Sequence, residues 1–254
     1  MEKFLAYFDI LGFQEFIGNN TDQHIDLYMK NLFRESETAA SGRNYIDGKP
    51  GIWLPDFSKS RIHCLHVSDT IIFWSDDITT ESFKKIIECS SYFLHQIIQT
   101  RTFAVRGCIV AGNINFKPFQ IKNEVGIVFY NSSLYGKPII DAYKKAESQD
   151  WAGCYIDKSA IEKVEKDVIK RFIYENKVAY YQVPLKDGIF TYECTIRIFP
   201  HSINNVHFEN LAKGIEEVFN IHMKGNKIEE SVKKKMTNTI KFLNYFIENN
   251  TIEK

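Results

Sequence analysis

The N-terminal segment carries the clearest strand pattern in the chain. From residue 3 to residue 10 the residues alternate with a period of two, so that one face of an extended chain carries Phe4, Ala6, Phe8 and Ile10. The opposite face carries Leu5, Tyr7 and, at its end, Asp9. Apolar residues on both faces are typical of a central strand, and Gly12 then permits a tight turn. The pattern therefore predicts a buried strand that ends at a carboxylate.

Strand and helix patterns continue over the first 200 residues. Further strands are predicted at 61–73 (two strands that meet at Ser68-Asp69), 103–111, 153–157 and 178–199 (a hairpin that turns at 186–188). Helices are predicted where apolar residues recur every three or four positions, at about 25–33, 80–98, 137–146 and 158–170. Glycine and proline punctuate residues 36–60, which predicts a long loop. This order is typical of an α+β or α/β sandwich.

The last fifty residues change character. They are predicted to form two amphipathic helices, 210–223 and 228–246, that are separated by Lys224-Gly225-Asn226. We therefore divide the chain into a domain large enough to be catalytic, residues 1–200, and a C-terminal helical extension, residues 201–254. The extension could strengthen a dimer or pack on its own domain, and the pattern leaves both open.

The composition excludes several classes of protein. Apolar residues make up 44% of the chain and charged residues 25%, which is ordinary for a globular domain. Thirty-two basic residues balance thirty-two acidic ones, which argues against a partner that is a nucleic acid or an anionic membrane. No apolar run is long enough to cross a membrane, and the five cysteines form no C-x-x-C motif. We expect a cytoplasmic protein.

Two aspartates stand out as candidates for chemistry. Asp9 and Asp69 each lie at a strand end beside a turn, in strongly apolar surroundings. A buried carboxylate is costly unless a positive group compensates it. If the two strands lie side by side, the two carboxylates favour a divalent cation between them. Taken singly, each aspartate could simply cap a turn.

Four segments, in the same order along the chain, resemble motifs of the class III nucleotidyl cyclases. Phe8-Asp-Ile-Leu-Gly-Phe13 resembles the Phe-x-Asp-Ile-x-Gly-Phe opening of that family, and Val67-Ser-Asp69 resembles the Gly-Asp of its hairpin. Val105–Gly112 resembles its Arg-x-Gly strand, and Leu134–Glu147 resembles the helix that carries its transition-state Asn and Arg. The resemblance covers about residues 1–157. It implies an α+β sandwich with a ferredoxin-like βαββαβ core, followed in this chain by a C-terminal helical hairpin.

The resemblance also implies an active site. Asp9, the backbone carbonyl of Ile10 and Asp69 would bind two Mg²⁺ or Mn²⁺ ions, and Arg106 would contact the triphosphate of a nucleoside triphosphate substrate. The site would form at the interface of a homodimer, where the second subunit contributes Lys144 to stabilise charge on the transferring phosphoryl group. Read without the family, Arg106 could form a structural salt bridge and Lys144 could be a solvated helix lysine.

The chain departs from the family pattern at several positions. The family's transition-state Asn and Arg fall at Ile140 and Lys144, and lysine is a point charge without the planar fork of arginine. The base-selecting Lys and Asp fall near His63 and Ser133, which match no purine-cyclase pocket. The lysine that holds the γ-phosphate has a loose counterpart in Lys177.

Small divergent cyclases of this kind resemble the pyrimidine cyclases of Pycsar anti-phage defence. These make cyclic UMP or cyclic CMP, which triggers a separately encoded effector. The resemblance therefore implies a lyase that converts UTP or CTP to a 3′,5′-cyclic mononucleotide and pyrophosphate.

Two other functions compete with this interpretation. A degenerate cyclase fold could sense a nucleotide without converting it, as the loss of the Asn and Arg suggests. A palm-type polymerase or dinucleotide cyclase would share the two-metal chemistry, but the chain lacks the Gly-Gly-Asp/Glu-Phe turn of such proteins.

Overall fold

A seven-stranded sheet forms the centre of the computed structural model, which describes residues 1–122, 124–126, 128–130, 132–198, 205–220 and 228–250. The strand order is β12-β13-β11-β6-β1-β5-β4. All neighbouring strands are antiparallel except β11 and β6, which are parallel. The strands are β1 (Glu2–Ile10), β4 (Ile62–Val67), β5 (Thr70–Ser75), β6 (Val105–Asn113), β11 (Cys154–Ile156), β12 (Val178–Pro184) and β13 (Phe190–Ile196). The N-terminal strand is therefore central, as its apolar faces predict.

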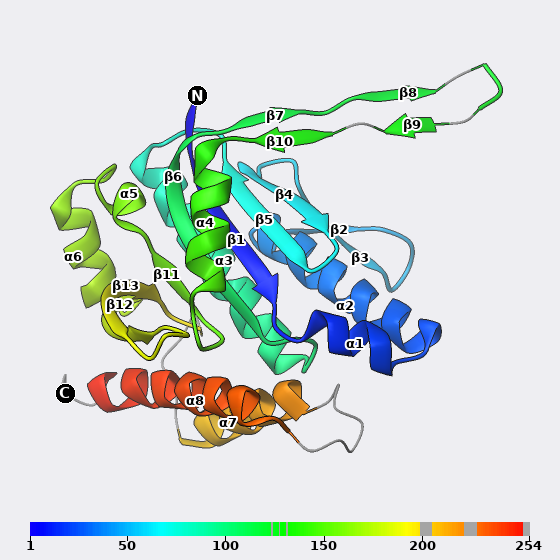
Figure 1. Ribbon diagram of the computed structural model, residues 1–254. Helices are drawn as coiled ribbons and strands as arrows, with labels where there is room; N and C mark the ends of the chain where they lie inside the picture. The colour runs from blue at the N-terminus through cyan, green and yellow to red at the C-terminus, as the bar shows by residue number, and fades with distance from the viewer. Residues whose placement is uncertain (123, 127, 131, 199–204, 221–227, 251–254) are drawn as a thin grey trace.

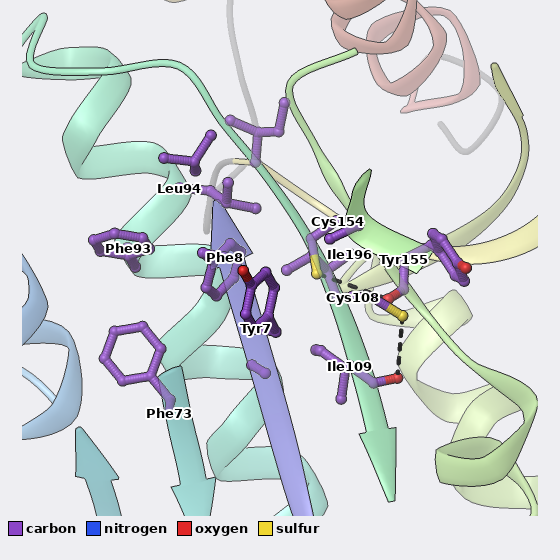
Figure 2. Close-up of a cluster of buried hydrophobic side chains, with 14 of the residues drawn as sticks. Tyr7, Phe8, Phe73, Phe93, Leu94, Cys108, Ile109, Cys154, Tyr155 and Ile196 are labelled. Atoms are coloured by element: carbon purple, nitrogen blue, oxygen red, sulfur yellow. Dashed lines mark hydrogen bonds between the residues drawn. The ribbon is translucent and has the colours of Figure 1, made fainter. Parts of the chain in front are cut away.

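Helices cover both faces of the sheet (Figure 1). On one face lies α3 (Thr80–Gln99), whose Phe93 ring contacts Phe8 with centroids 5.2 Å apart. On the other face lies α4 (Lys137–Glu147), whose Tyr143 ring lies 6.0 Å from that of Tyr7. Figure 2 shows the consequence of the alternation, because Tyr7 and Phe8 project from opposite sides of β1.

The remaining helices surround this sandwich. A Gly12 backbone in the left-handed region (φ 73°) leads from β1 into the first of them. They are α1 (Phe13–Asn19), α2 (Asp22–Ala40), α5 (Lys158–Ile161), α6 (Lys166–Tyr174), α7 (Asn205–Asn220) and α8 (Glu230–Asn250). The α+β class and the βαββαβ order of the core are thus confirmed.

Glycine allows two close contacts at the centre of the fold. A Cβ at Gly107 of β6 would lie 2.5 Å from the ring of Phe8, and a Cβ at Gly112 would lie 2.7 Å from Pro138 of α4. Both distances are shorter than van der Waals contact, so each position requires glycine. The second contact lets the start of α4 approach the sheet closely.

The sequence-based assignment was wrong in two segments. Residues 36–60 are not one long loop, because α2 continues to Ala40 and a small hairpin follows, β2 (Tyr45–Asp47) with β3 (Trp53–Pro55). This hairpin is largely exposed on both faces, so it has no alternation to reveal it. Residues 158–170 are not one helix, because α5 ends at Ile161 and α6 begins only at Lys166. No glycine or proline marks that break.

An arm from residue 115 to residue 135, to which the sequence pattern assigned no element, extends away from the sandwich (Figure 1). It consists of two short antiparallel pairs, β7 (Asn115–Lys117) with β10 (Ser133–Tyr135) and β8 (Gln120–Lys122) with β9 (Val128–Tyr130). Its side chains include Phe119 and Ile121, which are exposed. The arm therefore presents apolar groups to solvent.

The two C-terminal helices pack on their own chain. The Trp151 ring contacts Phe242 of α8 with centroids 4.3 Å apart, and the Ala152 amide donates to the Thr239 hydroxyl at 2.8 Å. Leu243 of α8 is also fully buried. Of the two arrangements that the pattern left open, packing on the chain itself is present. The described part of the chain has no helix that is long and apolar enough to cross a membrane.

Candidate active site

Asp9 lies at the end of β1, held by a cation from the neighbouring strand. In the sheet register it faces Arg106 of β6 on one side and Thr70 of β5 on the other. The Arg106 Nε and Nη2 atoms lie 2.9 and 2.8 Å from Asp9 Oδ2. Both contacts use the same carboxylate oxygen. No described residue forms a hydrogen bond or ion pair with Oδ1, so this second oxygen is available to a ligand.

The turn that carries Asp69 is fastened to the end of the same strand. It connects β4 to β5, and Ser68 in the turn adopts a left-handed backbone (φ 57°). The Ile10 amide donates a hydrogen bond to the Asp69 carbonyl at 3.0 Å. The central position of β1 thus brings both aspartates and the Ile10 backbone to one end of the sheet, which is the arrangement that the two strand patterns suggested.

The electrostatics of this region favour a cation. Burial raises the pKa of Asp9 above its ordinary value, although Arg106 acts in the opposite direction, and the negative charges of Asp69 and Glu147 raise it further. The pKa of Tyr7 is also raised, first by burial and then, with smaller effect, by the two aspartates. Burial and the neighbouring carboxylates thus act together against the charged form of Asp9, and a bound cation would oppose both effects.

The residues present fit a hard divalent cation. Such ions prefer oxygen ligands, and Mg²⁺ in particular is usually bound by one or two carboxylates together with substrate phosphates. Within the described ranges no three His, Cys, Asp or Glu side chains come together as a ligand set. Metal binding by the two aspartates and the Ile10 carbonyl, with substrate or water completing the coordination, therefore stays a prediction.

Arg106 occupies a structural position. It is only 8% exposed, and its Nη1 donates to the Glu147 carbonyl at the C-terminal end of α4 at 2.9 Å. It therefore joins β1, β6 and α4, and it orients Asp9. Contact between Arg106 and a triphosphate stays a prediction.

Lys144 lies on the outer face of α4. The helix buries Ala142 and Ala146 against the sheet, while Ile140 and Lys144 are exposed. Lys144 makes no ion pair with any residue of the described part of the chain, whereas the adjacent Lys145 pairs with Asp157. Lys144 is therefore an exposed cation of α4 without a carboxylate partner among the described residues, and its role in catalysis stays a prediction.

The two positions predicted to select the base lie apart from the aspartates. His63 of β4 stacks on Trp74 with ring centroids 5.2 Å apart, and its Nε2 lies 2.6 Å from Asp76 Oδ1. Both rings line a cavity of about 590 Å³ beside β4, which Phe33 also lines. Ser133 is exposed at the start of β10 on the arm.

Lys177 is not brought to the aspartates. It lines a different cavity beside α3, and its Nζ lies 3.3 Å from Glu88 and 2.9 Å from Glu175. The structure thus gathers Asp9, Ile10, Asp69 and Arg106, and it places His63, Ser133 and Lys177 elsewhere on the chain.

Sequence reasoning missed several polar groups around the aspartates. The Tyr7 hydroxyl lies 3.1 Å from the Thr70 hydroxyl, and a hydrogen bond between Tyr143 and Glu147 raises the pKa of Tyr143. Tyr7 could have been found, because the period of two puts it on the same face as Asp9.

Searches of protein-family models and of curated proteins found no match. Among solved structures, the guanylate cyclase domain of RhGC from Catenaria anguillulae in complex with GTP is similar with a TM-score of 0.51 at 10% identity. The catalytic core of a rhodopsin-guanylyl cyclase with converted specificity, in complex with ATPalphaS, is similar with a TM-score of 0.50 at 11% identity. Each match covers 77% of this chain and 96% of the other. The chain therefore has the fold of the class III nucleotidyl cyclase domains, as its motifs predicted.

Proposed function

We propose that this chain is a nucleotidyl cyclase that converts a nucleoside triphosphate to a 3′,5′-cyclic mononucleotide and pyrophosphate. The observation that carries the proposal is the pair of carboxylates, Asp9 and Asp69, at one end of a sheet with the cyclase fold. Because Asp9 is partly desolvated and its pKa stays raised beside Arg106, a metal ion shared with Asp69 would stabilise its charged form.

In the reaction the 3′ oxygen of the ribose forms a bond to the α-phosphorus. The bond from that phosphorus to the oxygen bridging to the β-phosphate breaks, pyrophosphate leaves, and the proton of the 3′-hydroxyl passes to solvent. Two Mg²⁺ or Mn²⁺ ions held by Asp9, Asp69 and the Ile10 carbonyl would supply Lewis-acid activation of the hydroxyl and neutralise the leaving charge. Arg106 keeps Asp9 in place for this role.

The active site is proposed to form between two copies of the chain. Lys144 is exposed on α4 and has no carboxylate partner among the described residues, so it is available to a neighbouring subunit. The arm with exposed Phe119 and Ile121 offers an apolar surface for the same contact. Lys144 of one copy would then stabilise charge on the phosphoryl group bound by the other.

The proposed substrate is UTP or CTP. A stacked His63–Trp74 pair lines the cavity beside β4, and the lysine and aspartate of purine cyclases are replaced near His63 and Ser133. A histidine fixed by Asp76 offers a different set of hydrogen-bonding groups from a lysine. The product would act as a messenger for a separately encoded effector in anti-phage defence.

We expect purified protein to form one cyclic mononucleotide when it is incubated with ATP, GTP, CTP and UTP together in Mn²⁺. Mass spectrometry identifies the product and its base in a single experiment. Cyclic UMP or cyclic CMP supports the pyrimidine assignment, and cyclic AMP or cyclic GMP overturns it while leaving the cyclase intact. Absence of any cyclic product contradicts the proposed function.

A mixture of two inactive variants tests the shared site. Asp69→Ala and Lys144→Ala should each be inactive alone. When the two variants are unfolded together and refolded as a mixture, random pairing makes half of the dimers mixed, and each mixed dimer has one intact site of two. The mixture should therefore regain up to about 25% of the wild-type rate. Mass spectrometry of intact dimers verifies the mixing. Verified mixed dimers without activity would contradict a site built from both subunits.

A nucleotide sensor of the same fold is the second candidate. The engagement of Arg106 by Asp9 and the Glu147 carbonyl favours it, because that arginine already has its partners. Nucleotide binding without turnover of any of the four triphosphates would support the sensor over the cyclase.

A further inference from the structure

A second cavity, of about 440 Å³, has walls that are strongly basic. It lies between the C-terminal end of α2, the residues before β4, one side of α3 and the residues that flank β12 and β13. Its lining contains one carboxylate, Glu88, and six cations, namely Arg43, Lys59, Arg61, Lys85, Lys177 and Arg197. Since acidic and basic residues are equal in number over the whole chain, positive charge is concentrated here. We propose that this cavity binds a small phosphate-bearing anion.

The fold fixes one of these cations in an unusual backbone conformation. Helix α2 and its C-cap Ser41 are followed by two left-handed residues, Gly42 (φ 66°) and Arg43 (φ 63°), and the Arg43 amide donates to the Thr38 carbonyl at 3.0 Å. A left-handed backbone is uncommon for a residue with a side chain. It places the Arg43 guanidinium over the ring of Tyr92 on α3, 5.4 Å from the centroid. The arginine is thus held at the cavity rather than left to move in solvent.

A second cation is buried in the cavity wall. Arg197 is 5% exposed, and its Nη1 donates to the Asn176 carbonyl at 3.3 Å. Burial lowers its pKa to about 10, which leaves the group charged at neutral pH. A positive charge at this depth strengthens the field in the cavity, because the surrounding protein screens charge less than water does.

The carboxylates nearby compensate only part of the charge. Lys177 pairs with Glu88 and Glu175, and Lys85 lies 3.9 Å from Glu81. The three exposed cations, Arg43, Lys59 and Arg61, lie within 4 Å of no carboxylate that the structure describes, although Lys59 acts on Asp56 and Arg61 on Asp77 from a longer distance. They provide two guanidinium groups and one ammonium group that a ligand could bind, and guanidinium groups bind phosphate through paired hydrogen bonds.

The size and the polar lining narrow the ligand class. A volume of about 440 Å³ is in the range of small-molecule sites. Tyr92 offers an aromatic ring, and Asn44 and Ser60 offer uncharged polar groups beside the cations. The Ser60 hydroxyl donates to the Ala40 carbonyl at 2.5 Å, which ties the segment before β4 to the end of α2 and keeps the walls together. A phosphorylated small molecule fits this combination better than a simple halide or a protein segment.

Isothermal titration calorimetry with inorganic pyrophosphate tests the proposal on the full chain. The titration is done in EDTA, which removes divalent ions. Without these ions the two carboxylates of the Asp9 site repel pyrophosphate, so binding at that site does not contribute to the signal. We expect saturable binding to one site, which Lys59→Gln/Arg61→Gln weakens by about tenfold or more, since it removes two charged donors. The matched control is Lys30→Gln/Lys170→Gln, which removes the same charge from exposed positions elsewhere and should leave binding within about twofold.

The proposal would be overturned by no saturable binding, by an equal loss in the control variant, or by equal competition by acetate at the same ionic strength. An Asp69→Asn variant separates this cavity from the proposed cyclase site. It should keep pyrophosphate binding in EDTA whether or not the chain is a cyclase, and loss of binding in that variant would place the anion at the aspartates instead.

Discussion

Asp69→Asn is expected to reduce cyclic nucleotide formation by roughly 10³-fold or more, because loss of a metal-binding carboxylate removes several kcal/mol of transition-state stabilisation. Its side chain makes no hydrogen bond or ion pair within the described part of the chain, and only its backbone carbonyl is engaged, by Ile10. Asparagine has nearly the same shape and keeps that backbone contact. The variant should therefore lose turnover and retain the melting temperature of the wild type.

Initial rates in Mn²⁺ and a thermal melt of the same sample measure both quantities. Asp26→Asn is the matched control, because Asp26 is an exposed residue of α2 that pairs only with Lys30. It should leave the rate and the melting temperature unchanged. An Asp69→Asn protein that keeps a rate near that of the wild type would show that the carboxylate pair does not bind the catalytic metals.

The position of this aspartate could be predicted from sequence because local patterns determine it. The alternation of β1 and the turn between β4 and β5 are visible in short stretches of sequence, and the central place of β1 follows from its apolar faces. Pairing of β1 with β5 then brings Asp9 and Asp69 to the same end of the sheet. The two local patterns can be read from short stretches of sequence, and the β1–β5 pairing is the one distant contact that this part of the site requires.

The rest of the site depends on contacts between segments far apart in the chain. The partnership of Asp9 with Arg106 follows from the register of β1 against β6, across 97 residues. The Arg106 contact with the end of α4 depends on how that helix crosses the sheet. Strand β8 of the arm and the β2–β3 hairpin were missed for a different reason, because elements exposed on both faces have no apolar periodicity to detect.

Asp9→Ala is expected to lose turnover, as Asp69→Asn does. Unlike Asp69→Asn, it should also lower the free energy of unfolding by about 2–4 kcal/mol, because it leaves the buried Arg106 guanidinium without its carboxylate. Two effects oppose each other. Burial raises the pKa of Asp9, so removal of this carboxylate relieves a cost, but its side chain is 15% exposed and keeps some contact with water. The Arg106 side chain is 10% exposed and cannot follow its charge into solvent. The loss of the pair therefore outweighs the relief.

Asp9→Asn separates the two consequences of that substitution. The amide oxygen can still accept from Arg106, so this variant should lose turnover while it keeps most of the stability that Asp9→Ala loses.

The pH dependence of the free energy of unfolding supplies a second readout. The pKa of Asp9 in the folded protein is raised above 3.8, its value in the unfolded chain. In the pH interval between these two pKa values the folded wild type binds more protons than the unfolded chain. Its free energy of unfolding therefore falls as the pH rises through that interval. Urea denaturation across this interval should show a smaller fall for Asp9→Asn. Equal stability of the Ala and Asn variants at neutral pH would mean that Arg106 does not depend on Asp9, and the site would then lack the support on which its geometry rests.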